Sequence, residues 1–62
     1  MTIFENIKRL LDEKGISVIE FENKIGLQRG GFYKWQNHEP GISKVKAAAE
    51  YLNVSIDSLM QE

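Results

Sequence analysis

Apolar residues recur about every three or four positions through most of the chain, and this spacing predicts a series of short amphipathic helices. The first predicted helix follows Thr2, which has capping-box spacing to Glu5, and ends at Gly15. Its apolar stripe consists of Ile3, Ile7, Leu10 and Leu11. A second helix is predicted from Ser17, which repeats the capping-box spacing, to Gly26.

The inward face of the second helix is predicted from Phe21 and Ile25, which lie four positions apart and therefore share one side. Either Val18 or Ile19 extends this face. Leu27 follows the glycine as a single apolar residue. The second helix is therefore expected to be short and to end in a tight turn.

A third helix is predicted over about residues 29–36. Phe32 and Trp35 lie three positions apart, and both are expected to point into the core rather than to stack on bases. Gly30 and Gly31 fall in the first turn of this helix, where each glycine costs up to about 1 kcal/mol relative to alanine. The start of the third helix is therefore expected to be weak.

The composition of residues 37–41, with asparagine, proline and glycine, predicts a loop. A fourth helix is predicted from Ile42 or Ser43 to Leu52, with Asn53 as its stop. The inner face of that helix consists of Val45, Ala48, Ala49 and Leu52.

Ser55 is predicted to cap a last short helix, with Asp57 in its first turn. The buried set of this helix is predicted to be Ile56, Leu59 and Met60. No segment alternates between apolar and polar residues as a half-buried strand does. The sequence therefore predicts an all-α fold of five helices with short connections, forming a single domain over residues 1–62.

The composition is that of a small globular domain, with 42% apolar and 27% charged residues among 62. Because the chain has no cysteine, neither a disulfide nor a thiolate zinc site can stabilise it. No apolar run approaches the roughly 20 residues that a membrane span needs, so no membrane partner is expected. Without a signal-peptide pattern, a cytoplasmic location is the default expectation.

Charge is distributed unevenly along the chain, although the net charge is only −1. Residues 24–46 carry a net charge of +4, with Glu39 as the single acid, and the remainder of the chain carries −5. The basic residues of this segment are Lys24, Arg29, Lys34, Lys44 and Lys46. A basic patch on an acidic body is typical of a face that meets phosphate. On charge alone, a mixed solvated surface explains the pattern equally well.

The most informative unit of the sequence is residues 17–36. It combines a helix of about nine residues, a glycine, one apolar residue and a second helix with two aromatic anchors. A tight turn of this kind sets two helices at roughly 90–120°, which is the geometry of a helix-turn-helix. One face of the second helix is then anchored, and the other is free to enter a groove. This geometry alone is not exclusive to DNA-binding proteins.

An ordered set of segments resembles the lambda-repressor-like, Cro/cI-type (XRE) helix-turn-helix domain over about residues 5–60. The segments are residues 15–17 (Gly-Ile-Ser), 20–27 (Glu-Phe-Glu-Asn-Lys-Ile-Gly-Leu), 32–35 (Phe-Tyr-Lys-Trp), Pro40 and 48–59 (Ala-Ala-Glu-Tyr-Leu-Asn-Val-Ser-Ile-Asp-Ser-Leu). The resemblance implies a compact five-helix fold that binds double-stranded DNA sequence-specifically, with the third helix in the major groove. It also implies a homodimer on a two-fold operator and a role in bacterial or phage transcription, typically as a repressor.

Carried over by position, the family's base contacts fall on Arg29, Gly30, Tyr33 and Lys34, and its phosphate contacts on Ser17, Val18, Gln28, Asn37 and His38. Arg29 has the forked donors that guanine O6 and N7 accept, and Lys34 suits guanine or a phosphate. Tyr33 suits a thymine methyl group or a phosphate, whereas Gly30 has no side chain with which to bind. Lys44 is explained equally well as a phosphate contact and as part of a solvated face.

The sequence departs from the family's pattern at three places that bear on DNA affinity. Val18 stands where such domains often have glutamine, so one phosphate contact is expected to be lost. Leu11 and Gln36 stand where the family commonly pairs arginine with glutamate, and an apolar replacement of a buried ion pair can be neutral or stabilising. Gly30 and Gly31 weaken the third helix, which is expected to become fully ordered only on DNA.

The residue inventory does not favour an enzyme. The serines are interpreted as caps or surface hydroxyls, and His38 has no evident nucleophile or acid to complete a triad. One histidine without cysteine does not form a metal site, and Gly30-Gly31 lacks the spacing of a phosphate-binding loop. Glu20 is interpreted as a capping residue and Glu22 as a surface residue. We therefore expect no catalysis, no cofactor and no small-molecule ligand.

A second hypothesis is a protein-interaction module of the same fold, such as an antitoxin or antirepressor component. The near-neutral net charge and the missing glutamine at position 18 favour it. The oligomeric state is also open, because a dimer-forming apolar patch and the end of the core explain the same residues equally well. These residues are Tyr51, Leu59 and Met60.

Overall fold

The computed structural model describes residues 2–61. Within this range it contains five helical segments and no strand, which confirms the all-α prediction. The segments are α1 (Ile3–Lys14), α2 (Val18–Ile25), the 3₁₀ helix η1 (Gly31–Gln36), α3 (Ile42–Leu52) and α4 (Ile56–Met60). None of the described helices has the length and apolar character needed to cross a membrane; the longest, α1, has 12 residues.

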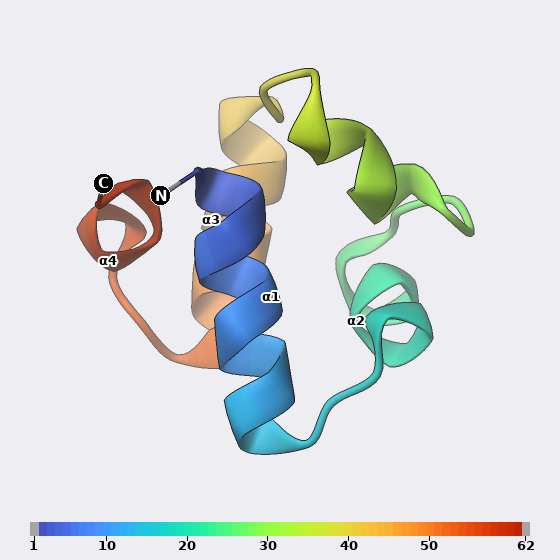
Figure 1. Ribbon diagram of the computed structural model, residues 1–62, viewed down its shortest axis with the longest axis horizontal. Coiled ribbons are helices and arrows are strands. Elements are labelled where there is room, and N and C mark those ends of the chain that lie inside the picture. The colour runs from blue at the N-terminus through green and yellow to red at the C-terminus, as the bar shows by residue number, and fades with distance from the viewer. Residues whose placement is uncertain (1, 62) are drawn as a thin grey trace.

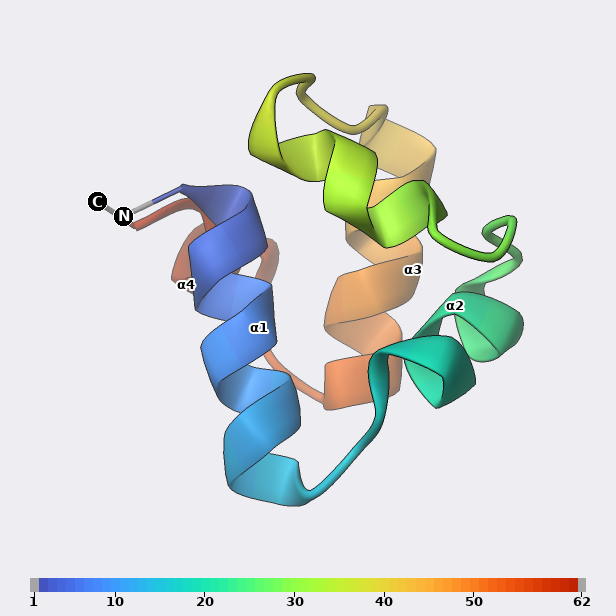
Figure 2. The same ribbon diagram turned by 45° about the vertical axis from the view of Figure 1, so that its right-hand side comes forward.

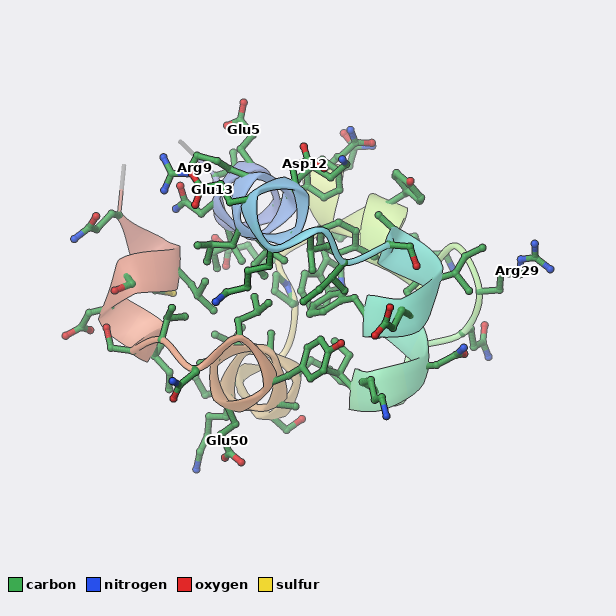
Figure 3. The ribbon with its side chains drawn as sticks, turned by 90° about the horizontal axis from the view of Figure 1, so that it is seen from below. Glu5, Arg9, Asp12, Glu13, Arg29 and Glu50 are labelled. Atoms are coloured by element: carbon green, nitrogen blue, oxygen red, sulfur yellow. The ribbon has the colours of Figure 1, made fainter. Side chains whose placement is uncertain are left out.

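Helices α1 and α3 run in the same general direction on opposite sides of the core, with α4 on one flank and α2 on the other (Figure 1 and Figure 3). The 3₁₀ helix η1, drawn in green, lies across the end of the molecule where α1 and α3 begin (Figure 2). Helix α1 contacts η1, α2 and α4, and α3 contacts α2 and α4. This arrangement leaves one side of η1 facing outward.

Polar caps determine where α1, α2 and α4 begin, as the sequence predicts. Thr2 Oγ1 accepts the N–H of Glu5 at 3.1 Å, and Glu5 Oε1 accepts the N–H of Thr2 at 2.9 Å, which completes a capping box. Ser17 and Ser55 cap α2 and α4, each accepting a backbone N–H three residues ahead at 3.1 Å. The predicted stops, which adopt the left-handed conformation, are Gly15, Gly26 and Asn53.

Tyr51 of α3 joins that helix to α2. Its hydroxyl lies 3.4 Å from Glu20 Oε2, and its ring centroid lies 6.1 Å from that of Phe21. Desolvation raises the pKa of Tyr51, and the neighbouring Glu20 carboxylate raises it further by a smaller effect. Glu20 therefore donates its backbone N–H to the Ser17 cap, while its carboxylate faces α3 and does not act as the predicted capping residue.

The core is apolar and draws on every helix. Its buried apolar residues are Phe4, Ile7, Leu11, Phe21, Ile25, Phe32, Val45, Ala48, Ala49, Leu52 and Leu59. Phe4 extends the stripe predicted for α1. Val18 packs against the core, whereas Ile19 is 49% exposed, which decides between the two residues that the sequence left open.

The prediction that Met60 is buried is wrong, because its side chain is 54% exposed. Successive residues of an α-helix point about 100° apart. Leu59 takes the inward position of the five-residue helix α4, so the next residue leaves the core. Leu59 therefore completes the core, while Met60 remains at the surface.

Asn6 of α1 is a buried polar residue that the sequence pattern does not predict. Its Nδ2 donates to the carbonyl of Leu59 at 2.8 Å and to that of Gln61 at 2.7 Å. Only 2% of the residue is exposed. Asn6 therefore fixes the end of α4 and the residue after it against α1.

The third helix differs from its prediction in both start and type. It is a 3₁₀ helix that begins at Gly31, two residues later than expected. Gly30 has φ = +84°, which a right-handed helix does not accommodate, so Gly30 precedes the helix rather than lying in its first turn. The N–H of Tyr33 donates to the Gly30 carbonyl at 3.2 Å, which is the three-residue bond of a 3₁₀ helix.

Candidate nucleic-acid interface

The turn between α2 and η1, residues 26–30, begins and ends with a glycine in the left-handed conformation. Gly26 has φ = +80° and Gly30 has φ = +84°. Between them, Leu27 packs against the core, whereas Gln28 and Arg29 are exposed. Figure 3 shows the Arg29 side chain extending away from the body of the molecule. The turn 26–30 therefore presents polar side chains to solvent from a backbone anchored by Leu27.

Glu22 of α2 holds the far end of the turn 26–30. Its Oε1 accepts the N–H of Gly30 at 3.1 Å, and its Oε2 accepts the N–H of Phe32 at 3.0 Å. Only 2% of Glu22 is exposed, so its interpretation as a surface residue is wrong. The carboxylate satisfies amide donors that the start of a helix leaves without intrahelical partners.

A sequence signal for the burial of Glu22 exists in the spacing of α2. Glu22 lies three positions before Ile25, and residues three apart on a helix are neighbours on its surface. The position of Glu22 therefore favours the inward side of α2, even though its residue type favours the outside.

The 3₁₀ geometry divides η1 into three faces, because residues three apart share a face at about three residues per turn. Phe32 and Trp35 form the inward face, with ring centroids 5.4 Å apart. Phe32 is fully buried and Trp35 half-buried, so their predicted role as core anchors is confirmed. The two other faces consist of Gly31 with Lys34 and of Tyr33 with Gln36.

Lys34 lies beside a shallow hollow of about 390 Å³ between η1 and the loop 37–41. Gln28 and His38 line the same hollow, and the side chains of all three residues are exposed. Further lining residues are Leu27, Trp35, Glu39 and Pro40. The structure thus brings one predicted base contact together with two predicted phosphate contacts.

Tyr33 lies on the opposite flank of η1, beside α1. Its ring centroid is 6.1 Å from that of Phe4, and 49% of the residue is exposed. Lys8 of α1 lies near enough to this flank for Tyr33 to raise its pKa. The larger cause of the raised pKa of Lys8 is its hydrogen bond to Asp12, at 2.7 Å. Sequence reasoning missed Lys8, because α1 is distant from η1 along the chain.

The remaining phosphate candidates lie at helix ends. The Ser17 hydroxyl caps α2, and Val18 packs partly buried against the core. Asn37 and His38 follow η1, and their N–H groups donate to the carbonyl of Lys34 at 3.1 and 3.0 Å, while their side chains are exposed. Asn37 and His38 are therefore held next to η1, whereas Val18 offers no polar side chain.

Lys44 and Lys46, two basic residues of the segment 24–46, lie at different parts of the surface. Lys44 Nζ lies 3.3 Å from the carbonyl oxygen of Ile25 and 3.4 Å from that of Gly26, at the end of α2. Lys46 is exposed and borders a hollow of about 310 Å³ whose other lining residues belong to α3, α4 and their connection. The basic segment is therefore divided between the region of the turn 26–30 and the outer part of α3.

Comparisons of the chain with models of protein families, with curated proteins and with solved structures found no match. The described residues define a small all-helical domain with a fixed turn between α2 and a short, partly exposed 3₁₀ helix. A function for this domain is therefore argued from the geometry and charge of that surface.

Proposed function

We propose that the chain binds double-stranded DNA sequence-specifically through the turn 26–30 and the outward faces of η1. The observation that carries this proposal is the Arg29 side chain, which extends into solvent from a backbone held by Glu22 (Figure 3). Beside it, Tyr33 and Lys34 lie exposed on adjacent faces of η1. A protruding edge with several hydrogen-bond donors suits the base edges of a DNA groove.

The position of η1 supports an approach to the major groove. The major groove of B-DNA, about 12 Å wide, admits a helix together with its side chains. In helix-turn-helix proteins the N-terminal residues of the second helix contact the bases. This end of η1 adjoins Arg29, so Arg29 is the side chain that we place deepest in the groove.

The side chains around η1 have distinct roles in this proposal. Arg29 donates its forked N–H groups to guanine O6 and N7. Lys34 binds guanine or a phosphate, and Tyr33 packs on a thymine methyl group or donates its hydroxyl to a phosphate. Gly30 contributes no side chain, and its left-handed backbone sets the position of Arg29 relative to η1.

Phosphate contacts in this proposal come from both ends of η1. Gln28 and His38 lie beside Lys34 around one hollow, so these groups can follow one stretch of DNA backbone. Asn37 lies next to His38, and Ser17 offers its hydroxyl at the start of α2. Such contacts fix the register of the protein on the duplex.

Acids on the outer sides of α1 and α3 lie away from Arg29 (Figure 3), whereas Glu39 lines the hollow beside Lys34. Glu5 and Glu13 lie on the outer side of α1 and Glu50 on the outer side of α3, whereas Arg29 projects from another side (Figure 3). Because the labelled acids lie away from Arg29, they repel the phosphates of a bound duplex less than acids beside it would.

We also propose the lambda-repressor-like fold and a role in bacterial or phage transcription, typically repression, by a homodimer on a two-fold operator. The resemblance over residues 5–60 supports this part of the proposal. The arrangement agrees with it in three respects: α2 ends at Gly26, Phe32 and Trp35 anchor η1, and α4 follows Ser55.

Selection from a pool of random duplexes at low salt tests the proposal. We expect enrichment of a short motif, with affinity that falls steeply as salt rises. On the selected site, Arg29→Ala is expected to cost about 1–3 kcal/mol and to relax the preference at one base pair. Lys46→Ala, which removes an exposed positive charge from α3, is the matched control and is expected to keep that preference.

Two results would contradict the proposal. Binding that is equal for wild type and Arg29→Ala would remove Arg29 from the interface. A pool without enrichment at low salt would refute sequence-specific DNA binding and would leave the protein-interaction module as the better hypothesis.

A further inference from the structure

We propose that Lys44 is a positioning residue for the turn 26–30, and that it is not a phosphate ligand. This inference rests on the proposed function, because the turn matters as the support of Arg29. It assigns Lys44 a role that its position in the sequence leaves open.

The contacts of Lys44 direct its charge into the protein. Its ammonium lies 3.3 Å from the carbonyl oxygen of Ile25 and 3.4 Å from that of Gly26. These are long hydrogen bonds, so the interaction is mainly the attraction between the cation and the exposed carbonyls at the C-terminus of α2. A methyl group at Gly26 would lie 3.5 Å from the ammonium, which shows how closely Lys44 covers the start of the turn.

The position of Lys44 in α3 argues for the same role. Lys44 is the third residue of α3, and Gly41 at the start of that helix provides no side-chain cap. A positive charge in the first turn of a helix is unfavourable, because the N-terminus carries a partial positive charge. The same charge is favourable at the C-terminus of another helix. Lys44 therefore suits α2 better than the helix that contains it.

Lys44 and Glu22 hold the two ends of the turn with opposite charges. The ammonium of Lys44 lies against the carbonyls of Ile25 and Gly26, and the carboxylate of Glu22 accepts the N–H groups of Gly30 and Phe32. Gln28 and Arg29 lie on the backbone between these two attachments. Loss of Lys44 removes one of these two attachments, so the whole turn, including the amides of Leu27 and Gly30, is expected to open more often.

Lys44→Met tests the inference, because methionine keeps an apolar stem and removes the charge and the donors. In the DNA-free protein, amide exchange at Leu27 and Gly30 is expected to rise about two- to fivefold, the factor that corresponds to a cation at a helix C-terminus. Exchange at Ile16, whose N–H donates to the Leu11 carbonyl at 2.9 Å just beyond α1, serves as the reference for a helix end that Lys44 does not contact.

DNA binding by the same variant separates positioning from phosphate contact. A phosphate ligand contributes about 0.9 to the slope of log affinity against log salt concentration. We expect Lys44→Met to bind the selected site more weakly by a similar factor at every salt concentration, with an unchanged slope. Lys46→Met, two positions along α3, is the matched control and is expected to leave exchange at Leu27 and Gly30 unchanged.

Three results would overturn the inference: unchanged exchange at Leu27 and Gly30, unchanged DNA affinity, or a slope reduced by about 0.9. Failure of the wild-type chain to select any duplex would instead refute the proposed function. In that case the exchange measurement still decides whether Lys44 holds the turn.

Discussion

Replacement of Glu22 by glutamine is expected to destabilise the protein, although it keeps the size and shape of the side chain. In the wild type, each carboxylate oxygen accepts one backbone N–H, from Gly30 at 3.1 Å and from Phe32 at 3.0 Å. Glutamine has one carbonyl oxygen, so it can accept one of these donors, and it presents its own NH₂ group to the other. Glu22→Gln therefore places two donors against each other inside the protein.

The expected magnitude follows from these two hydrogen bonds. Loss of one bond to a charged group costs about 1.5–3 kcal/mol. The other bond becomes neutral and loses roughly half of its strength. The total is about 2–4 kcal/mol. A domain of 62 residues has about 3–9 kcal/mol of stability, so this single change removes a large part of it.

Urea denaturation followed by circular dichroism and by tryptophan fluorescence measures this loss. Trp35 is the single tryptophan, and its ring centroid lies 5.4 Å from that of Phe32, so its fluorescence reports on η1. Glu20→Gln is the matched control, because Glu20 lies exposed on the same helix. Its side chain contacts the Tyr51 hydroxyl at 3.4 Å. The control is expected to stay within about 0.5 kcal/mol of wild type.

Equal unfolding free energies for Glu22→Gln and Glu20→Gln would refute the reasoning. So would unchanged amide chemical shifts of Gly30 and Phe32 in Glu22→Gln, because these two amides lose or weaken their acceptor. A loss of stability together with shifts at both amides is the result that agrees with a carboxylate bound at the start of η1.

Further predictions concern the helix start, the end of α4 and the pH dependence of stability. Gly30→Ala is expected to lower the free energy of unfolding by about 1–2 kcal/mol, because Gly30 has a left-handed backbone. Gly31→Ala is expected to raise it by about 0.4–1 kcal/mol, because the new Cβ would lie in ordinary contact, 3.7 Å from that of Leu27. Urea denaturation measures both changes, and changes of the same sign would contradict a helix that begins at Gly31. Asn6→Ala is expected to cost about 1–3 kcal/mol, because two carbonyl acceptors at the end of the chain lose their donor; unfolding free energies measure the loss, and amide exchange in α4 should rise with it. Hydrogen bonds from the Thr2 backbone and side chain lower the pKa of Glu5 from 4.5. Glu5 therefore stabilises the fold above its unfolded-state pKa, and this contribution is lost as the pH falls through the folded-state pKa. Glu5→Gln is expected to reduce the dependence of unfolding free energy on pH as the pH falls below 4.5, and an unchanged dependence would contradict the capping box.

The helix boundaries were predictable where a local chemical signal determines them. Ser17 and Ser55 cap helices within three residues of their own positions, and Gly26 and Asn53 end helices through their own backbone conformation. Such effects involve neighbours in the sequence, so the sequence contains the whole cause. The inward residues of the longer helices followed from spacing for the same reason.

Features that depend on contacts between helices were not predictable in this way. Glu22 is buried because the amides of Gly30 and Phe32 lie against it, and Asn6 is buried because the carbonyls of Leu59 and Gln61 lie against α1. Both residues are polar, so residue type alone places them at the surface. At the candidate site, the exposure of Arg29 and Lys34 agrees with the sequence, whereas the direction of Lys44 depends on the packing of α3 beside α2.

The two adjacent glycines, which led to the expectation that η1 orders only on DNA, have different roles in the structure. Gly30 is required by its positive φ, and its N–H is bound by Glu22, whereas Gly31 belongs to η1 and has room for a Cβ. The start of η1 is therefore held from inside the protein before any partner is present. Ordering a binding surface is one of the costs of association. Within the proposed function, that cost falls mainly on exposed side chains such as Arg29, because the turn 26–30 and the start of η1 are already held by Glu22.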